Sequence, residues 1–518
     1  MYNIFNKLRQ LLGVHCLEYV LNRTGLVYVQ KEDDITFSHN EVCTLRQIND
    51  LVKSTRVRLI QQDLYEDQYL SLMSRYKVNN KPLFHHYREV CGGVIPQKSS
   101  DDELLNYFYS IASREYPSML MYSIGLVARN YNYNAVYPYD HERLKGFIGN
   151  DVIDGLSNNE DGFNHALKFV TDDGISHLVN LMSLLENIIT VSFQNCTFRS
   201  CFGFDDLVLE IDKQVDFLRN IACKKEGVYS SFIGIVGLNL GSIPEIKLEN
   251  LVVRQFGDMQ TPNTLAKMAL SNRNEQGVIS SYGCIAEITH RTNFIDEIKD
   301  YSSSNSKLSI YYINKYQEAF KLALIFTTFE TKGFKYVFST MGHCTSGVGN
   351  HTYSRDARPS GYISIEYSQL PTLRYWYGLL LKQDLKTVAL PIRKISQAIF
   401  ERNNEEDSFI DAITALEGLF GAQGETLFKV STSVSLFLYD TYEERTASKR
   451  AIKKLYDMRS KIVHGNNDNA LTHEDISNAS KEVLGITLAC LAKLLKDETL
   501  FKLPSHERIN HIVYSDDY

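Results

Sequence analysis

Two residues near the end of the chain, Arg459 and His464, are the strongest candidates for chemistry in this sequence. They are separated by four residues, and this spacing of arginine before histidine occurs nowhere else in the chain. A histidine can move protons near neutral pH because its ordinary pKa is about 6.5. An arginine stays charged and donates two parallel hydrogen bonds to a phosphate. The pair therefore suits chemistry at a phosphate ester.

The segment that carries this pair has the periodicity of an amphipathic helix. Five residues recur at i, i+3, i+4, i+7 and i+11 and so share one face: Ile452, Leu455, Tyr456, Arg459 and Val463. A guanidinium within an apolar stripe is costly unless an anion or a hydrogen-bond partner meets it. Gly465 is predicted to cap the helix. His464 then lies in the last turn, where the helix dipole favours the imidazolium.

Two stretches of the last quarter of the chain carry a family pattern. Residues 455–465 read Leu-Tyr-Asp-Met-Arg-Ser-Lys-Ile-Val-His-Gly, and residues 406–420 contain Ala415-Leu416-Glu417. Together they resemble the ApeA-like branch of the HEPN superfamily, whose ribonucleases carry an Arg-x(4–6)-His motif at the end of a helix. The resemblance implies a HEPN helical bundle with Arg459 and His464 as catalytic residues. It also implies anti-phage defence by abortive infection, in which a toxin-like nuclease cleaves host RNA, with tRNA as one candidate.

RNA can be cleaved without a metal by these two residue types. One group must remove the 2′-hydroxyl proton, the leaving 5′-oxygen must be protonated, and a cation must stabilise the phosphorane. Glu417 is a candidate to orient Arg459 or His464, and Asp457 and Ser460 flank the arginine as further supporting residues. The competing interpretation is that Glu417 forms a buried ion pair with Arg459 that only stabilises the bundle.

The spacing of the pair indicates a homodimer or a higher homo-oligomer. Five residues of helix rise about 7.5 Å and rotate about 140°, so the two side chains of one helix diverge. Two such helices facing each other across a two-fold axis would bring one pair to the other. The resemblance implies the same composite site at a dimer interface, and the apolar stripe around Arg459 is what such an interface needs.

Composition limits the other classes of function. The chain has 518 residues, 44% of them hydrophobic, and a net charge of −7 without a long basic run, so an RNA contact must come from a local basic site. No signal peptide or membrane span is predicted. The nine scattered cysteines indicate reduced thiols, and we expect a cytoplasmic protein. We expect no cofactor and no metal, because no ligands recur at recognised metal spacing.

The chain is predicted to have an α+β multidomain fold, with a mixed N-terminal region, a β-rich part and an all-α bundle. The predicted regions are 1–160, which is mixed; 161–370, a mixed α/β sensor or regulatory region; 375–500, the bundle; and 501–518, a weakly ordered tail. Residues 25–29 resemble a short strand. Helical stripes are present at residues 178–189, 208–218, 388–399, 409–420 and 484–495, and Thr472 and Asp475 nearly match a capping box that opens the last of these helices. Residues 228–240, 251–256, 277–288 and 335–341 are predicted strands, and residues 362–367 alternate like a strand. Residues 1–370 are candidates to bind a phage-derived trigger.

Other polar groups are better explained as structural. The loop Gly342–His351 contains Cys344 beside a histidine, but it matches no phosphate loop and no nucleophile elbow, so a hairpin loop is the preferred interpretation. His85 and His290 have no partners at metal spacing. Two alternatives to the nuclease stay open: a catalytically silent HEPN bundle that serves as the assembly module of a binding or sensor protein, and an enzyme in the N-terminal region that acts on a small molecule.

Overall fold

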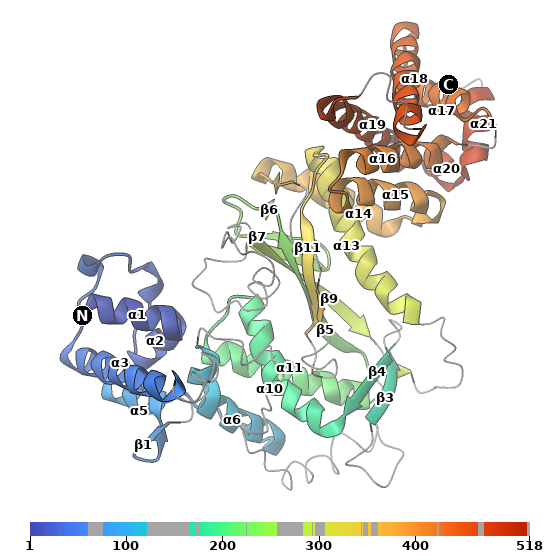
Figure 1. Ribbon diagram of the computed structural model, residues 1–518. Coiled ribbons are helices and arrows are strands. Elements are labelled where there is room, and N and C mark those ends of the chain that lie inside the picture. Colours follow the sequence, from blue (N-terminus) through green and yellow to red (C-terminus); the bar gives the residue numbers. More distant parts are fainter. Residues whose placement is uncertain are drawn as a thin grey trace. The chain divides into compact units, whose positions relative to one another are not determined.

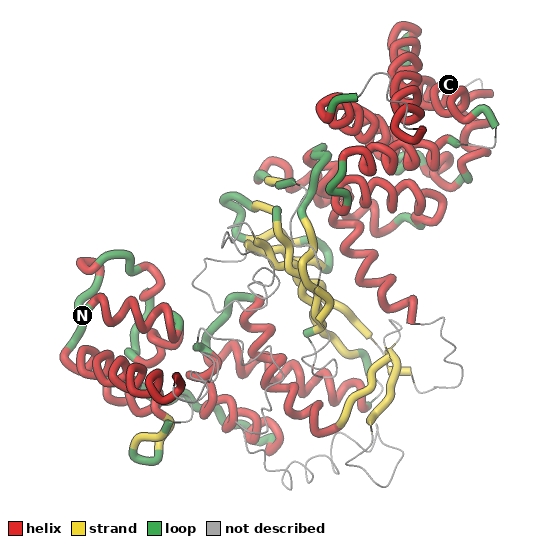
Figure 2. Tube along the Cα trace, in the orientation of Figure 1, coloured by secondary structure: helices red, strands yellow, loops and turns green. Residues whose placement is uncertain are grey.

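A computed structural model describes residues 1–60, 76–121, 166–171, 176–223, 225–255, 283–292, 294–295, 306–342, 344, 351–353, 361–421, 424–464 and 471–514. These residues combine helices with β-sheet (Figures 1 and 2), which confirms the predicted mixed α+β class. The chain forms two compact units: the first comprises 1–234, 254–310 and 337–355, and the second 235–253, 311–336 and 356–518. Each unit is built from separated segments, so the predicted boundaries near 160 and 370 do not coincide with the limits of the units.

The first unit begins with short helices packed around one core. They are α1 (Tyr2–Leu12), α2 (Val14–Val20), α3 (His39–Ile60), α5 (Leu83–Val90) and α6 (Glu103–Met119), with 3-10 turns at Leu26–Tyr28 and Glu32–Asp34 and a hairpin of β1 (Lys77–Val78) and β2 (Lys81–Pro82). In α1, helical spacing places Phe5, Leu8 and Leu12 in the core. The Asp102 carboxylate caps α6 by accepting hydrogen bonds from the first turn.

The expected strand at residues 25–29 is wrong. Gly25 adopts a left-handed conformation with φ of 80°, and the following residues form a 3-10 turn. The backbone N–H of Leu26 donates to the Glu18 carboxylate at 2.9 Å instead of to a neighbouring strand. A branched-residue pattern that short cannot specify a strand when no partner strand is available.

Two long helices complete the first unit, α10 (Leu181–Phe198) and α11 (Phe204–Ala222), which lie side by side in Figure 1. The stripe predicted at residues 208–218 is confirmed, because Val208, Ile211, Val215 and Leu218 are buried. Leu178 was expected on a helix but lies in strand β4 (Ser176–Asn180), opposite Lys168 of the antiparallel strand β3 (Ala166–Thr171). Pairing with β3 overrides the helical periodicity there.

The β-type runs of the sequence form one sheet of six strands in the order β12-β11-β5-β9-β8-β7. The strands are β5 (Gly227–Val236), β7 (Glu245–Lys247), β8 (Leu251–Gln255), β9 (Gly283–Thr292), β11 (Lys335–Met341) and β12 (His351–Tyr353). Strand β10 (Phe294–Ile295) pairs with β3, and β13 (Ile363–Ser364) pairs in parallel with β6 (Leu238–Asn239). The antiparallel pairing of β11 and β12 confirms the hairpin predicted around Gly342–His351.

The expected strand at 362–367 is shorter than predicted. Of these residues, Ile363 and Ser364 form the strand. Tyr367 was expected to share a face with Ile363 and Ile365, but it is 57% exposed whereas those two are buried. Glu366 and Gln369 close a capping box around a 3-10 turn at Tyr367–Gln369, which ends the extended run.

The second unit contains most of α13 and the helices from residue 370 onward, where the all-α part of the chain was predicted. They are α13 (Ser306–Thr328), α14 (Leu370–Lys382), a 3-10 turn at Leu385–Val388, α15 (Ala389–Ser396) with a π-helical extension (Gln397–Glu401), α16 (Glu405–Phe420), α17 (Thr426–Leu438), α18 (Tyr442–His464), α19 (His473–Leu494), α20 (Glu498–Lys502) and α21 (Ser505–Tyr514). The predicted stripes of α15, α16 and α19 are buried. The predicted cap of α19 is also confirmed, because Thr472 and Asp475 form a reciprocal capping box.

The tail of residues 501–518 was expected to be weakly ordered, and this is wrong for residues 501–514, which contain the end of α20 and all of α21. Arg508 of α21 is fully buried and donates to the backbone oxygens of Leu500 at 3.1 Å, Leu419 at 2.8 Å and Leu503 at 2.8 Å. Burial lowers the pKa of Arg508 to about 10, so it is still charged at neutral pH. Arg508 therefore ties α21 to the carboxyl end of α16 through carbonyls that the helix ends leave unpaired.

None of the helices within the described ranges has the length and apolarity needed to span a bilayer. All nine cysteines are free thiols.

Candidate functional site

The two residues of the Arg-x4-His pair both lie on α18, but in different surroundings. His464 is the last residue of α18 and is exposed, whereas Arg459 is partly buried. Gly465, the predicted cap, lies outside the described residues. Ile452 and Leu455 of the predicted stripe are buried, but Val463 is 57% exposed. The apolar face of α18 is thus covered in its middle and open at its end, next to His464.

Tyr456 of α18 interacts electrostatically with two charged residues, Arg459 on its own helix and Glu417 on α16. Helices α16 and α18 pack together. Burial raises the pKa of the Tyr456 hydroxyl, and the neighbouring Glu417 carboxylate raises it further, while Arg459 acts in the opposite direction. The Tyr456 hydroxyl and the Arg459 Nε are nevertheless buried without a hydrogen bond of ordinary geometry. Glu417, Tyr456 and Arg459 therefore form one polar group inside the helical unit.

The positions of Glu417, Tyr456 and Arg459 bear on the role of Glu417, for which the sequence left two interpretations open. No ion pair joins Glu417 to Arg459 within the described residues, although both groups act on Tyr456. The competing interpretation of a buried Glu417–Arg459 ion pair is therefore not supported, and neither is a direct contact by which Glu417 would orient Arg459. Two buried polar atoms without partners cost about 1–3 kcal/mol each. Tyr456 was assigned to the apolar stripe, and its position one turn before Arg459 was the available signal for its role.

Asp457 and Ser460 lie elsewhere. Both are exposed, and neither makes a hydrogen bond or an ion pair with Arg459 in the part of the chain that the structure describes. The rotation of an α-helix places them on the solvent side of α18, away from the stripe. The prediction that they orient Arg459 within one chain is therefore not supported by this geometry.

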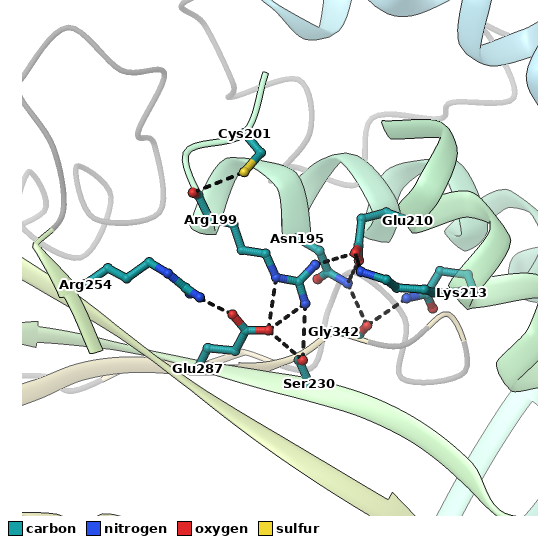
Figure 3. Close-up of polar contacts among 10 residues, drawn as sticks. Asn195, Arg199, Cys201, Glu210, Lys213, Ser230, Arg254, Glu287 and Gly342 are labelled. Carbon is teal, nitrogen blue, oxygen red and sulfur yellow. Dashed lines mark hydrogen bonds and ion pairs between the residues drawn. The ribbon is translucent and has the colours of Figure 1, made fainter. Parts of the chain in front are cut away.

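A second polar cluster, which the sequence analysis did not find, lies in the first unit (Figure 3). Arg199, just after α10, donates to the Glu287 carboxylate of β9 through Nη2 at 2.6 Å and Nε at 3.0 Å. Arg199 also pairs with Glu210 of α11. Arg254 donates to the other Glu287 oxygen at 2.7 Å, and the Ser230 hydroxyl donates to Glu287 at 2.8 Å. We call Arg199, Glu210, Ser230, Arg254 and Glu287 the Arg199 cluster.

The Glu287 carboxylate of the Arg199 cluster is ionised. Burial alone would raise the pKa of Glu287, but the hydrogen bonds and charge of Arg199, with help from Arg254 and Ser230, hold that pKa at about 2. The side chains of Glu287 and Glu210 are only 9% and 5% exposed. A buried charge of this kind persists only where its partners remain in place. The cluster joins two helices to the sheet.

The segment after β11 is held by the same helices. The Gly342 oxygen accepts from Asn195 at 2.9 Å and from Gln214 at 3.0 Å, and the Cys344 N–H donates to Gln214 at 2.8 Å. A Cβ at Gly342 would lie 2.6 Å from the Asn195 side chain, so only glycine fits. Cys344 is fully buried, which opposes the nucleophile interpretation.

Two of the remaining candidates are structural. The His85 Nε2 donates to the Arg114 oxygen at 3.0 Å while its Nδ1 accepts from Tyr19 at 2.7 Å, and burial lowers the pKa of His85. His290 is hydrogen-bonded to Ser231 at 2.7 Å. In the described ranges, no three His, Cys, Asp or Glu side chains are grouped closely enough to hold a metal ion.

Comparison with known proteins adds no further constraint: no protein-family description, no curated protein and no solved structure matches this chain.

Proposed function

We propose that this protein is a metal-independent endoribonuclease of the HEPN type. The observation that supports it is the end of α18, where an exposed His464 follows a partly buried Arg459 whose Nε has no partner. The Arg199 cluster is the other concentration of charge, but its groups are paired with one another, as a structural cluster requires.

In the proposed reaction, His464 removes the proton from a ribose 2′-hydroxyl. The 2′-oxygen then bonds to phosphorus, the bond to the 5′-oxygen breaks, and the 5′-oxygen takes up a proton from water, while the protonated His464 later returns its proton to solvent. Arg459 stabilises the negative charge that builds up on the phosphorane. Proton transfer of this kind contributes about 10²–10⁴-fold to a rate.

The proposed site is composite. Along α18 the pair is separated by about 7.5 Å and about 140°, so one helix does not present both groups to one phosphate. Val463 leaves an exposed apolar side chain on the face that carries Arg459. A second copy that packs there in two-fold symmetry would cover Val463 and bring its own His464 to this Arg459.

The biological setting that we propose is defence against phage by cleavage of host RNA, with tRNA as one candidate. A nuclease of this kind must be restrained until infection. Residues 1–370 are the proposed sensor of a phage-derived trigger. Cell survival after expression of the full chain, with and without phage, is the measurement that tests this setting.

Cleavage is expected to continue in EDTA and to leave 2′,3′-cyclic phosphate and 5′-hydroxyl ends, because a histidine and an arginine replace the metal. Purified protein is incubated with total RNA, and the ends are identified by their reaction with phosphatase and polynucleotide kinase. Products with 5′-phosphate ends, or a strict requirement for Mg²⁺, would instead indicate a two-metal nuclease.

Mixing two inactive variants should restore activity in part. If the arginine of one copy serves the histidine of the other, a heterodimer of Arg459→Ala with His464→Ala contains one complete pair. We expect the co-expressed heterodimer to cleave RNA at up to about half of the wild-type rate, since one of two sites is complete. Light scattering of the active enzyme supplies the control: an active monomer contradicts the composite site.

A further inference from the structure

One face of α18 carries five cationic side chains. Lys449, Arg450, Lys453, Lys454 and Lys461 are all exposed. At 3.6 residues per turn, they and His464 fall within a sector of about 140° around the helix. From Lys449 to His464 the chain has a single acidic residue, the exposed Asp457, which lies within the same sector and leaves the face with a net positive charge. We call these five cations and His464 the cationic face of α18.

The five cations are not neutralised by the protein itself. None of them makes an ion pair with a carboxylate among the described residues, whereas exposed lysines elsewhere do, as Lys81 does with Glu89 and Lys386 with Asp384. Like charges three or four residues apart on a helix destabilise it by about 0.2–0.5 kcal/mol per pair. The helix keeps at least three such pairs on this face: Lys449 with Lys453, Arg450 with Lys453, and Arg450 with Lys454.

The positive charge of this face of α18 is local, and the row of cations ends at His464 of the proposed catalytic site. The whole chain has a net charge of −7, so this face stands out against an acidic protein. From Lys449 to Lys461 the helix rises about 18 Å, and His464 lies on the same side at the end of the row. A polyanion laid along the row would place one of its phosphates at His464.

We propose that the cationic face of α18 binds the RNA backbone and delivers it to His464. The occupant is a single strand of RNA, held through its phosphates without regard to base sequence. The delivery of RNA to His464 for cleavage rests on the proposed function, whereas the binding of RNA by the cationic face does not.

An anionic membrane surface fits this face less well. Helices that bind membranes insert an apolar face next to their cations. In α18 the apolar residues Ile452 and Leu455 are instead buried inside the unit. An acidic protein segment would match the charge, but not the position of His464 at the end of the row.

The test measures binding in the cleavage-deficient His464→Ala chain, so that the RNA stays intact. Lys453→Gln with Lys454→Gln removes two cations from the face. The matched control is Lys382→Gln with Lys481→Gln, two exposed helical lysines of the same unit that lie off this face. Fluorescence anisotropy with a labelled 20-nucleotide single-stranded RNA is recorded between 0.05 and 0.5 M salt, and thermal melts verify folding.

Each phosphate contact contributes about 0.7 to the slope of log K against log salt for a single strand. Loss of two contacts should therefore lower the magnitude of the slope by about 1.4. If variant and parent bind equally at 1 M salt by extrapolation, the variant should bind RNA about 25-fold more weakly than the parent at 0.1 M salt. The control pair should bind like the parent chain. Equal losses in both pairs, or none in either, would overturn the proposal, as would tighter binding to phosphatidylserine vesicles or to poly-glutamate than to RNA.

The same experiment separates this proposal from the nuclease assignment. If the wild-type chain cleaves RNA and the variant with both Lys453 and Lys454 replaced binds RNA normally, the proposal that the cationic face binds RNA is wrong, but the assignment as a nuclease stands. If the cationic face of α18 binds RNA but the wild-type chain does not cleave it, the RNA-binding proposal stands and the assignment as a nuclease is wrong.

Discussion

Replacing His464 by alanine should abolish RNA cleavage while the protein stays folded. His464 is exposed at the end of α18, so its removal leaves no cavity and breaks no described contact. The loss expected for a single proton-transfer group is about 10²–10⁴-fold. Arg459→Ala should reduce the rate by about 10²–10³-fold, because one charge-stabilising donor is lost. Both rates are measured by gel with purified protein and total RNA.

Two replacements of the same residue types provide the controls. His473→Ala on α19 and Arg393→Ala on α15 remove an exposed histidine and an exposed arginine from the same unit. Both should leave the rate unchanged. Retained cleavage in His464→Ala, with an unaltered melting temperature, would contradict the catalytic assignment. It would favour the alternative of a bundle that only mediates assembly.

Replacing Arg199 by methionine should destabilise the first unit by about 3–5 kcal/mol, because Glu210 and Glu287 would remain buried without their main partner. For a unit of this size the melting temperature should fall by roughly 6–20 °C. Lys81→Met, which breaks the exposed pair with Glu89, is the matched control and should cost less than about 1 kcal/mol. Equal melting temperatures for the two variants would exclude a structural role for the Arg199 cluster.

The Arg199 cluster should also make the free energy of unfolding of the first unit depend on pH in the acidic range. The pKa of Glu287 is about 2 in the folded chain and 4.5 in its ordinary state. Since the folded pKa is the lower one, the stabilisation is fully present above pH 4.5 and is lost as the pH falls toward 2. Its size is about 3 kcal/mol. The difference in melting temperature between wild type and Glu287→Gln should therefore shrink between pH 4.5 and pH 2, and a constant difference would contradict the assignment.

Local patterns were sufficient to predict much of the helical unit. The stripes of α15, α16 and α19 recur at helical spacing, and the cap formed by Thr472 and Asp475 involves residues only three positions apart. Interactions of this range are encoded in adjacent residues, so a sequence pattern detects them. The strands predicted at residues 228–240, 251–256 and 335–341 were detected for the same reason, and β5, β8 and β11 lie in these segments. The Arg-x4-His pair and its position at the end of a helix are likewise features that adjacent residues encode.

Only the tertiary structure decided which distant residues meet. Arg199 and Glu287 are 88 positions apart, and Arg508 reaches Leu419 across 89 positions. No local periodicity reports such a contact, because a buried charge is stabilised by whichever partner the fold brings to it. The same holds for Glu417 beside Tyr456, and for Val463, which continues the stripe of Ile452 yet is exposed because no described element covers the end of α18. The sequence alone determined the helix that carries the candidate chemistry; packing decided that its cations and His464 face solvent while Arg459 faces the protein.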